Sequence, residues 1–366
     1  MNLLLINSIG RQKWGGGEKW MVLAASELIK KGHQVHIGCR KNSILEQRAK
    51  ESNVPVVRID IYTDFSVLGY YQLKRLCKRY NIQLIIGCQN KDVRVSGFMS
   101  RMNNGPVVLS RQGVQLLNNS SKYKWSFLPY CDGIITNTNS IKNEYDSYGW
   151  WDEDFVKVIY NGINEEAQVK EQYDLSQYIP AGIENPLVIV STGRLAYQKG
   201  FEYLIDAAKT IVDKHPNVFF FIAGEGKLKN MLSKKINQLR LQEHVHLLGF
   251  HKSVSSLLNA ADIYVLPSLY EGMPNSLMEA LAHGLPAVST NVNGVAEMME
   301  DGTHGYIVEP GNTQALNKAI EQLIVDTELH IKGERGADHV KAKFSIDQMV
   351  TNLENHLLQK LSKKVL

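Results

Sequence analysis

Short apolar runs alternate with amphipathic stretches along the chain, and they do so in two successive series. Apolar runs rich in β-branched residues predict strands, whereas segments with an apolar residue every three or four positions predict helices. In the first series the predicted strands are 3–7, 34–39, 56–61, 82–86, 107–110 and 133–136, and the predicted helices are 18–31 and 67–80. Strands that alternate with helices favour a parallel, doubly wound sheet.

After a run at 156–160 the pattern loosens into a polar stretch that ends at Pro186, and the second series follows. Its predicted strands are 187–191, 218–223, 245–248, 263–267, 287–290 and 305–308. Its predicted helices are 201–215, 227–239, 254–260, 276–283, 295–299 and 313–325, with a last helix at 346–361. We therefore expect an α/β protein of two doubly wound domains, 1–165 and 186–345, with a linker at 166–185 and a helical segment at 346–366. Both sheets should turn the carboxyl ends of their strands towards one shared cleft.

The composition is typical of a globular protein, with 44% hydrophobic and 21% charged residues among 366. No apolar stretch approaches the roughly 20 residues that a spanning helix needs. The first apolar run is short and has no basic residue before it, unlike a signal peptide. The four cysteines form no C-x-x-C pair. These observations favour a reduced, cytoplasmic protein.

The charge is unevenly distributed. Residues 1–165 carry 22 Lys or Arg against 14 Asp or Glu, and the remainder carry 19 against 23. The basic half would attract an anionic acceptor or an anionic lipid surface, although incidental surface bias explains it equally well. The aromatic and basic residues that suggest such a surface are Arg11, Lys13, Trp14, Lys19, Trp20, Lys122, Lys124 and Trp125. No nucleic-acid-binding motif accompanies the charge, so we expect no nucleic-acid partner.

The segment 271–286 carries the most informative motif. It follows an apolar strand, and Asn275 or Ser276 is a suitable N-cap for the helix behind it. A helix that begins at the end of a strand favours a phosphate at its N-terminus. Glu271 and Glu279 flank this start, and carboxylates accept hydrogen bonds from sugar or ribose hydroxyls. From the spacing alone, a loop acid and a surface helix residue explain them equally well.

The loop 193–200 follows the first strand of the second series and contains Arg194 and Lys199. Two cations at a strand end would neutralise a diphosphate without a metal, and they would stabilise it as a leaving group. The alternative is a solvated loop with two ordinary basic residues.

Glycines mark three further strand ends. Gly15, Gly16 and Gly17 precede the first helix, where they allow a close approach to a ligand or simply form a flexible loop. Segments 223–226 and 248–251 would line a base and ribose pocket through Gly224, Phe250 and His251, and turn formation explains them as well. The histidines show no metal-ligand spacing, so we expect no metal site.

In their order and spacing, these segments resemble the family-4 retaining glycosyltransferases over nearly the whole chain. The resemblance also includes 32–35, 160–163 and 301–305. It implies a GT-B fold of two Rossmann-like domains, and a last helix that crosses back onto the first. It further implies transfer of a hexose or N-acetylhexosamine from a nucleotide diphosphate sugar, most simply UDP-linked. The implied acceptor is a saccharide or lipid-linked saccharide in cell-surface glycan synthesis, and no cofactor is implied.

The resemblance also assigns roles to residues. Arg194 and Lys199 match the pair on the donor diphosphate, with Gly193 beside them. Glu271 matches the acid near the transferred sugar, and Glu279 matches the acid on the ribose hydroxyls. Gly16 and Gly17 match a loop that closes on the phosphates. The backbone donors to sugar and phosphate match Gly272, Met273, Pro274, Asn275 and Ser276.

One position departs from the family. Where many members have a histidine after the fourth strand, this chain has Gln112, which can hydrogen-bond a hydroxyl but cannot carry a proton. Front-face attack, in which the departing phosphate takes the acceptor proton, needs no base there. A non-catalytic nucleotide-sugar binder and a nucleotide-sugar epimerase are the alternatives. A Rossmann oxidoreductase is disfavoured because the G-x-G-x-x-G fingerprint is missing.

Overall fold

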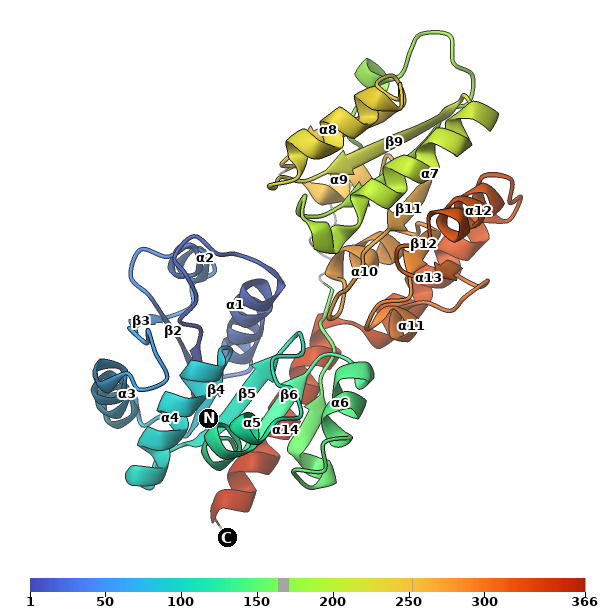
Figure 1. Ribbon diagram of the computed structural model, residues 1–366. Helices are drawn as coiled ribbons and strands as arrows, with labels where there is room; N and C mark the ends of the chain where they lie inside the picture. Colours follow the sequence, from blue (N-terminus) through green and yellow to red (C-terminus); the bar gives the residue numbers. More distant parts are fainter. Residues whose placement is uncertain (164–170, 252, 366) are drawn as a thin grey trace. The chain divides into compact units, whose positions relative to one another are not determined.

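The computed structural model describes residues 1–163, 171–251 and 253–365. The chain forms two compact units (Figure 1). Unit 1 contains Met1–Asn161 and the C-terminal segment from Asp347, and unit 2 contains Gly162–Ile346. Each unit is built on its own parallel sheet.

The sheet of unit 1 has seven parallel strands in the order β3-β2-β1-β4-β5-β6-β7. The strands are β1 (Asn2–Ile6), β2 (Gln34–Cys39), β3 (Val56–Arg58), β4 (Leu84–Gly87), β5 (Val107–Gln112), β6 (Gly133–Thr136) and β7 (Val156–Val158). β1 pairs with both β2 and β4, so the strand order reverses between β1 and β4.

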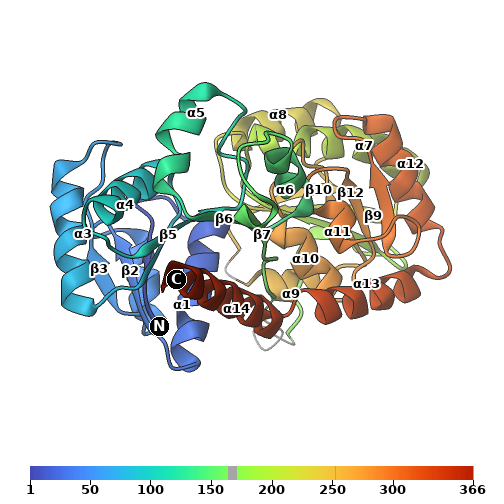
Figure 2. The same ribbon diagram turned by 90° about the horizontal axis from the view of Figure 1, so that it is seen from below.

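Helices cover both faces of this sheet. They are α1 (Gly16–Lys30), α2 (Ile44–Glu51), α3 (Val67–Tyr80), α4 (Asn90–Met102), α5 (Ser121–Ser126), α6 (Asn139–Asp146) and α14 (Ile346–Val365), with the 3-10 turns η1 (Leu128–Tyr130) and η2 (Glu153–Phe155). In Figure 2, α1 and α14 lie on one side of the strands, and α4 and α5 lie on the other. The final helix therefore completes the unit in which the chain begins.

α14 is held to unit 1 by buried leucines and by ion pairs. Leu353 and Leu357 have no exposed surface. Glu354 lies 2.7 Å from Nε2 of His33 and 3.1 Å from Nζ of Lys31. Lys363 pairs with Asp154 at 3.1 Å.

The sheet of unit 2 has six parallel strands in the order β10-β9-β8-β11-β12-β13. The strands are β8 (Leu187–Thr192), β9 (Val218–Ala223), β10 (Val245–Gly249), β11 (Ile263–Leu266), β12 (Ala287–Thr290) and β13 (Gly305–Val308). The helices are α7 (Phe201–Lys214), α8 (Lys229–Gln238), α9 (Val254–Leu258), α10 (Asn275–Ala282), α11 (Val295–Met298), α12 (Thr313–Ile324) and α13 (Leu329–Lys343), with the 3-10 turns η4 (Ser176–Tyr178) and η5 (Tyr197–Lys199).

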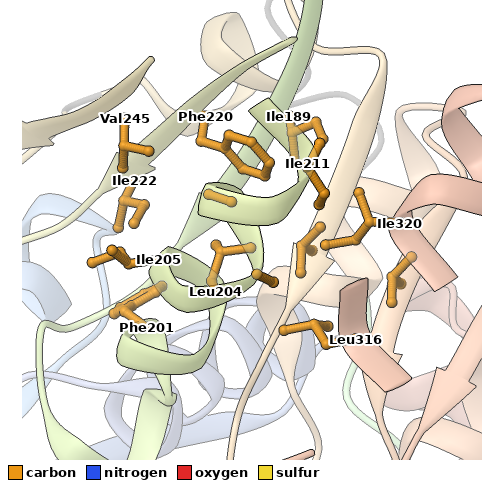
Figure 3. Close-up of a cluster of buried hydrophobic side chains, with 14 of the residues drawn as sticks. Ile189, Phe201, Leu204, Ile205, Ile211, Phe220, Ile222, Val245, Leu316 and Ile320 are labelled. Atoms are coloured by element: carbon orange, nitrogen blue, oxygen red, sulfur yellow. The ribbon is translucent and has the colours of Figure 1, made fainter. Parts of the chain in front are cut away.

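A close-packed apolar cluster joins α7 and α12 to one face of this sheet (Figure 3). Phe201, Leu204 and Ile205 of α7 meet Phe220 and Ile222 of β9 there. They recur at helical spacing on α7, whereas the β9 residues alternate, as expected for a helix face on a sheet face. Each fully buried side chain of this size contributes roughly 1.5–3 kcal/mol.

The structure refines the predicted boundaries. Unit 1 ends at Asn161, and the described part of the predicted linker, 171–185, belongs to unit 2. There Gln172 donates to the carbonyl of Asn259 at 2.9 Å, so this segment packs beside α9. Residues 164–170 lie outside the described residues. Among the described residues, five helices lie where the sequence pattern predicted none, namely α2, α4, α5, α6 and α13.

The described part of the chain contains no helix that is both long enough and apolar enough to cross a membrane.

Candidate active site

The centre of unit 2 lies where its strand order reverses, between β8 and β11. β9 and β10 follow β8 on one side, and β12 and β13 follow β11 on the other. Ligands of open parallel sheets bind at the carboxyl ends of the strands at such a point. The loops after β8 and β11 carry Arg194, Lys199 and Glu271, so three predicted site residues come from the two strands that form the switch point.

Glycines let these loops approach one another closely. A Cβ on Gly200 would lie 2.0 Å from the carbonyl oxygen of Pro267, and a Cβ on Gly224 would lie 1.8 Å from that of Gly193. Both glycines also have positive φ, of 61° and 152°, which other residues rarely adopt. These two glycines thus bring the ends of β8, β9 and β11 into backbone contact.

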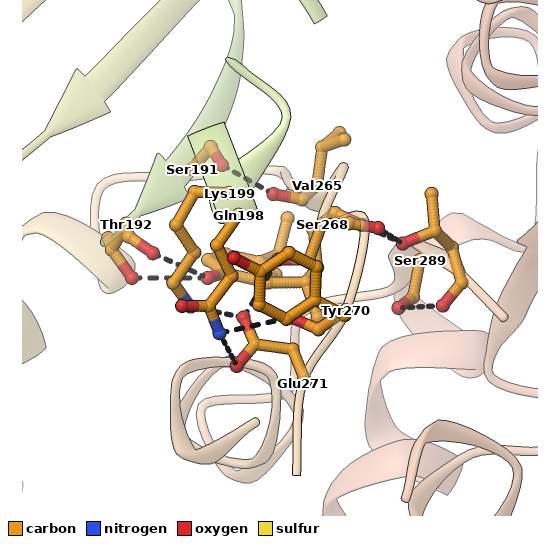
Figure 4. Close-up of polar contacts among 12 residues, drawn as sticks. Ser191, Thr192, Gln198, Lys199, Val265, Ser268, Tyr270, Glu271 and Ser289 are labelled. Carbon is orange, nitrogen blue, oxygen red and sulfur yellow. Dashed lines mark hydrogen bonds and ion pairs between the residues drawn. The ribbon is translucent and has the colours of Figure 1, made fainter. Parts of the chain in front are cut away.

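Lys199 and Glu271 form an ion pair across the switch point. The ammonium nitrogen Nζ of Lys199 lies 2.6 Å from Oε1 of Glu271, and their side chains are only 17% and 10% exposed. Figure 4 shows the two side chains meeting below the end of β8. Solvent screens an ion pair with so little exposure less than a surface pair, so the attraction between the two charges is stronger.

Two neighbours hold the carboxylate of Glu271. The hydroxyl of Ser268 donates to Oε1 at 2.9 Å, and the amide of Gln198 donates to Oε2 at 3.3 Å. The same Gln198 amide donates to the carbonyl of Tyr270 at 3.0 Å, and the Gln198 carbonyl accepts from the Leu269 backbone N–H at 2.8 Å. Gln198 therefore fastens the loop after β8 to the loop after β11 (Figure 4).

A buried hydroxyl layer lies beneath this pair. The hydroxyl of Ser191 donates to the carbonyl of Val265 at 2.6 Å, and that of Thr290 donates to the carbonyl of Ser268 at 2.5 Å. The hydroxyls of Thr192 and Tyr264 lie 3.1 Å apart. Burial raises the pKa of Tyr264 to about 12, so this phenol stays protonated at neutral pH. These contacts join β8, β11 and β12 at their carboxyl ends.

The N-terminus of α10 stands one residue earlier than predicted. Asn275 is its first residue, Pro274 occupies the N-cap position, and no side chain caps the helix. The predicted N-cap role of Asn275 or Ser276 is therefore wrong. The dipole of a helix favours an anion at its N-terminus, and no capping side chain stands at this one. Gly272, Met273 and Pro274 are buried beside it, and Glu279 is half-buried one turn further on.

The other predicted residues of unit 2 occupy the same edge of the sheet. The side chain of Arg194 is exposed, and the described part of the structure records no partner for it. Gly249 ends β10 and Phe250 follows it, and Phe250 is 76% exposed. The ring of His251 lies 4.4 Å from that of Tyr173.

Gly16 and Gly17 are the first two residues of α1 in unit 1. Gly15 occupies the N-cap position without a side-chain cap, and both following glycines are exposed. A Cβ on Gly17 would have no neighbour within 4 Å. The open start of α1 therefore has room for a ligand.

Gln112 lies inside unit 1 rather than at its surface. It is the last residue of β5 and has no exposed surface. Its amide nitrogen donates to the hydroxyl of Ser110 at 3.0 Å, and its amide oxygen accepts from the Tyr145 hydroxyl. The expectation that Gln112 meets the donor thus finds no support in its position, because both ends of its amide are already bound.

The neighbouring Arg111 is a polar residue that the sequence analysis missed. It is buried, its guanidinium lies 4.5 Å from the centre of the Trp20 ring, and Nη2 donates to Oδ1 of Asn161 at 3.0 Å. Burial lowers its pKa to about 10. Successive residues of a strand point to opposite faces, so Arg111 faces α1 whereas Gln112 faces α6.

At the switch point of unit 1, two acids satisfy local donors. The carboxylate of Asp92 accepts from the backbone N–H of Ser8 at 3.0 Å and from the Ser8 hydroxyl. Glu18 accepts from the amide of Asn7 at 2.7 Å. Among the residues that the structure describes, no group of three His, Cys, Asp or Glu side chains could hold a metal ion.

Comparison with known proteins adds two family matches. The model of "Glycosyltransferase Family 4" matches residues 14–167, and that of "Glycosyl transferases group 1" matches residues 179–337. The first match lies almost wholly in unit 1 and the second in unit 2.

The sequence similarity to curated relatives covers part of the chain. An Escherichia coli protein named UDP-Gal:alpha-D-GlcNAc-diphosphoundecaprenol alpha-1,3-galactosyltransferase is 30% identical over 55% of this chain and 53% of its own length. The lipopolysaccharide core biosynthesis glycosyltransferase LpsE of Rhizobium meliloti is 30% identical over 60% of this chain and 62% of its own. The chain spans about half the length of the curated relatives it matches first, with 50%, 45% and 51% of them covered.

The similarity to solved structures extends over both units. Anabaena HepE, solved in complex with UDP-glucose, superimposes with a TM-score of 0.82, at 20% identity over 98% of this chain and 100% of HepE.

Proposed function

Because the chain belongs to the family-4 glycosyltransferases and has their GT-B fold, we propose that it transfers a hexose or N-acetylhexosamine from a UDP-linked donor. The proposed acceptor is a saccharide or a lipid-linked saccharide in cell-surface glycan synthesis. The proposed transfer retains the anomeric configuration and needs neither a metal ion nor a cofactor.

The observation that carries this proposal is the Lys199–Glu271 pair at the switch point of unit 2. It brings a cation and a carboxylate to 2.6 Å of each other at the edge where ligands of such sheets bind. A diphosphate requires cations, and a sugar requires hydrogen-bond acceptors for its hydroxyls. Lys199 supplies the cation and Glu271 supplies the hydrogen-bond acceptor, and the two groups are in direct contact.

Relatives support the donor and acceptor classes. HepE was solved with UDP-glucose, and the name of the E. coli relative gives a UDP-linked donor and a lipid diphosphate acceptor. The R. meliloti relative is named for lipopolysaccharide core synthesis. These names motivate the choice of UDP and of a glycan acceptor for this chain.

The proposed chemistry is electrostatic. The bond from the anomeric carbon to the diphosphate oxygen breaks, and a bond to the acceptor oxygen forms on the same face of the sugar. The acceptor proton passes to the departing diphosphate. Lys199 and Arg194, with the N-terminus of α10, stabilise the charge that develops on that leaving group. Glu271 accepts a hydrogen bond from a hydroxyl of the transferred sugar, and Glu279 accepts from the ribose.

We further propose that the protein works in the cytoplasm, at the inner face of the membrane. A lipid-linked acceptor would be presented there. The basic excess of residues 1–165 supports attraction to anionic lipid headgroups.

Turnover of a panel of UDP-sugars tests the proposal. The purified protein is incubated with each donor and with soluble or lipid-linked saccharide acceptors, and released UDP and glycosylated product are both measured. We expect UDP release coupled to an acceptor-linked product whose anomeric configuration, read by NMR, matches that of the donor. We also expect undiminished turnover in excess EDTA.

The alternatives give different results in the same assay. A nucleotide-sugar epimerase would convert the donor without an acceptor-linked product. A non-catalytic binder would raise its melting temperature with donor but turn over none of the acceptors. Either result would overturn the proposed function.

A further inference from the structure

Large apolar side chains are exposed on one part of unit 1. They come from the loop before α3, from α3 itself, from α4 and from α5. The ring of Phe65 is 92% exposed and that of Trp125 is 78% exposed. The set, called here the α3–α4–α5 face, consists of Phe65, Leu68, Tyr71, Phe98, Met102 and Trp125. Exposed apolar residues that gather on one surface mark an interaction site, whereas single ones are common.

Direct contacts make this surface continuous. α3 and α4 lie side by side in both views (Figures 1 and 2). The ring of Tyr70 lies 5.3 Å from that of Tyr71 and 5.9 Å from that of Phe98, so the two helices share an aromatic seam.

The seam extends to α5 through Arg94 of α4. Its guanidinium pairs with Asp64 at 2.8 Å and donates to the carbonyl of Ser126 at 3.0 Å. Asp64 precedes Phe65, and Ser126 follows Trp125. The residues next to the two most exposed rings of the face therefore both contact the half-buried Arg94.

The exposed charged residues around the α3–α4–α5 face are predominantly basic. Segments 61–80 and 120–131 contain six basic residues, Lys74, Arg75, Lys78, Arg79, Lys122 and Lys124, all of them exposed. The single acid in these segments is Asp64, whose charge Arg94 neutralises. On α3 the apolar side chains occupy the first two turns and the cations occupy the last two. An aromatic and aliphatic surface with a cationic border is complementary to the headgroups of anionic lipids.

This surface differs from the one expected from the sequence. Trp20 is only 4% exposed and packs beneath Arg111, so it cannot face a membrane. Trp14 is half-buried, and Arg48 lies 5.9 Å from the centre of its ring. Trp125 belongs to the α3–α4–α5 face, and Lys122 and Lys124 lie beside it on α5. The sequence pattern predicted the helix that is α3 but did not place it or Phe65 on a lipid-binding surface.

We propose that the α3–α4–α5 face docks the protein on an anionic lipid bilayer, with Phe65 and its apolar neighbours in the headgroup region and the cations of α3 and α5 on the lipid phosphates. The proposal rests on the membrane-surface part of the proposed function and names the surface that carries it.

Flotation with lipid vesicles tests the proposal, without donor or acceptor present. We expect the full chain to float with vesicles of phosphatidylcholine that contain one-third phosphatidylglycerol, and to remain behind with pure phosphatidylcholine. The triple variant Phe65→Ser/Leu68→Ser/Tyr71→Ser should lose about tenfold or more in partitioning, because binding scales with inserted apolar area. Lys74→Glu/Lys78→Glu should lose about as much, with a weaker dependence on salt.

A matched variant in unit 2 provides the control. Val325, Lys234 and Lys318 are exposed as well, and Val325→Ser/Lys234→Glu/Lys318→Glu removes similar groups from the other unit. We expect this control to float like the unaltered protein. All replaced side chains are exposed, so the variants should keep their melting temperature. If the triple variant unfolds, flotation of Lys74→Glu/Lys78→Glu alone tests the docking face.

Two results would overturn the docking face. One is equal flotation of the face variants and the control. The other is unchanged flotation together with a change in sedimentation, which would make the face a contact between copies of this chain. Since no substrate is present, vesicle binding by a protein that fails to glycosylate soluble acceptors would count against the proposed transfer alone.

Discussion

The ammonium of Lys199 lies 2.6 Å from the carboxylate of Glu271, although 72 positions of sequence separate the two residues. The contact exists because β8 and β11 are neighbours in the sheet and both end at the same edge. It links the loop that would hold the diphosphate to the loop that would hold the sugar.

Replacing Lys199 should separate its role in transfer from its role in stability. For Lys199→Met we expect kcat/KM to fall about 100- to 1000-fold, as for the loss of one donor to a developing anion. The same variant should lose about 1–3 kcal/mol of unfolding free energy, because Glu271 keeps a shielded charge without its partner. Steady-state kinetics and urea unfolding measure the two effects.

The double variant Lys199→Met/Glu271→Gln is the control for this prediction. It should recover most of the lost stability, because neither charge is left alone, and it should remain inactive. Recovery of activity in the double variant would show that neither charge takes part in transfer and that Lys199 serves only to neutralise Glu271.

Gln198 should act as a positioning residue. In Gln198→Glu a second carboxylate replaces the amide that lies 3.3 Å from Oε2 of Glu271, so the two acids repel. We expect kcat to fall about tenfold or more with little change in the binding of UDP alone, and Gln198→Ala to have a smaller effect. The exposed Gln238 of α8 supplies the comparison, since Gln238→Glu should leave both quantities unchanged.

Two glycines should respond to alanine in opposite ways. Gly224→Ala would drive a Cβ to 1.8 Å from the carbonyl oxygen of Gly193, so we expect a loss of about 3 kcal/mol or more and no UDP binding. Gly17→Ala meets no neighbour within 4 Å and lies in the first turn of α1, so stability should rise by up to about 1 kcal/mol.

The affinity of Gly17→Ala for the UDP-sugar then tests the expected role of Gly17 near the donor phosphates. A methyl group at a point of close ligand approach weakens donor binding even though the protein is more stable. Unchanged affinity for the UDP-sugar in stable Gly17→Ala would remove Gly17 from the donor site.

Gln112 should prove to be structural. We expect Gln112→Met to lower the unfolding free energy by about 1–3 kcal/mol, because Tyr145 and Ser110 each lose a buried partner. The KM for the donor should be unchanged. Tyr145→Phe breaks the same contact, so the two substitutions should be less than additive in a double-mutant cycle. A selective rise in donor KM for Gln112→Met would restore the expectation from the sequence.

His356 of α14 should make stability depend on pH. It is 4% exposed, and within the described part of the chain neither ring nitrogen has a partner. Burial, reinforced by Lys360, lowers its pKa from 6.5 to about 4. Between pH 4 and pH 6.5, His356 is protonated in the unfolded chain but stays neutral in the folded protein. Stability therefore decreases as pH falls from about 6.5 to 4, by up to about 1.4 kcal/mol per unit.

Urea unfolding of His356→Leu at several pH values checks this contribution. The variant should lack this part of the slope and equal or exceed the unaltered protein at pH 5, because leucine has no ring nitrogen to desolvate. An identical slope in both proteins would assign the acid sensitivity to other groups.

The strands and most helices were readable from the sequence because their patterns are local. Val218–Ala223 has its predicted bounds, since an apolar run stops at Gly224. α4 escaped prediction because Gly97 interrupts its helical pattern. The structure explains this glycine, since a Cβ there would lie 1.9 Å from the carbonyl oxygen of Tyr130. Gly333 of α13 similarly lies against the backbone of Gly284. Tertiary contact in both cases overrides the local preference.

The site was readable only in part. Lys199 and Glu271 stood out as charged residues at strand ends, yet their contact depends on strand order, which no local pattern specifies. Gln198 carried no signal beyond its place beside Lys199. Nothing in the sequence indicated which face of the sheet Arg111 and Gln112 of β5 point to. A shift of one residue along a strand reverses the side to which a side chain points.

The return of α14 to unit 1 has a practical consequence for engineering. Unit 2 is one uninterrupted stretch, from Gly162 to Ile346, between two pieces of its neighbour. A chimaera that exchanges donor preference with a related enzyme therefore needs two junctions. A single crossover near residue 162 would import a foreign final helix and place a foreign counterpart of Glu354 opposite His33 and Lys31 of this chain.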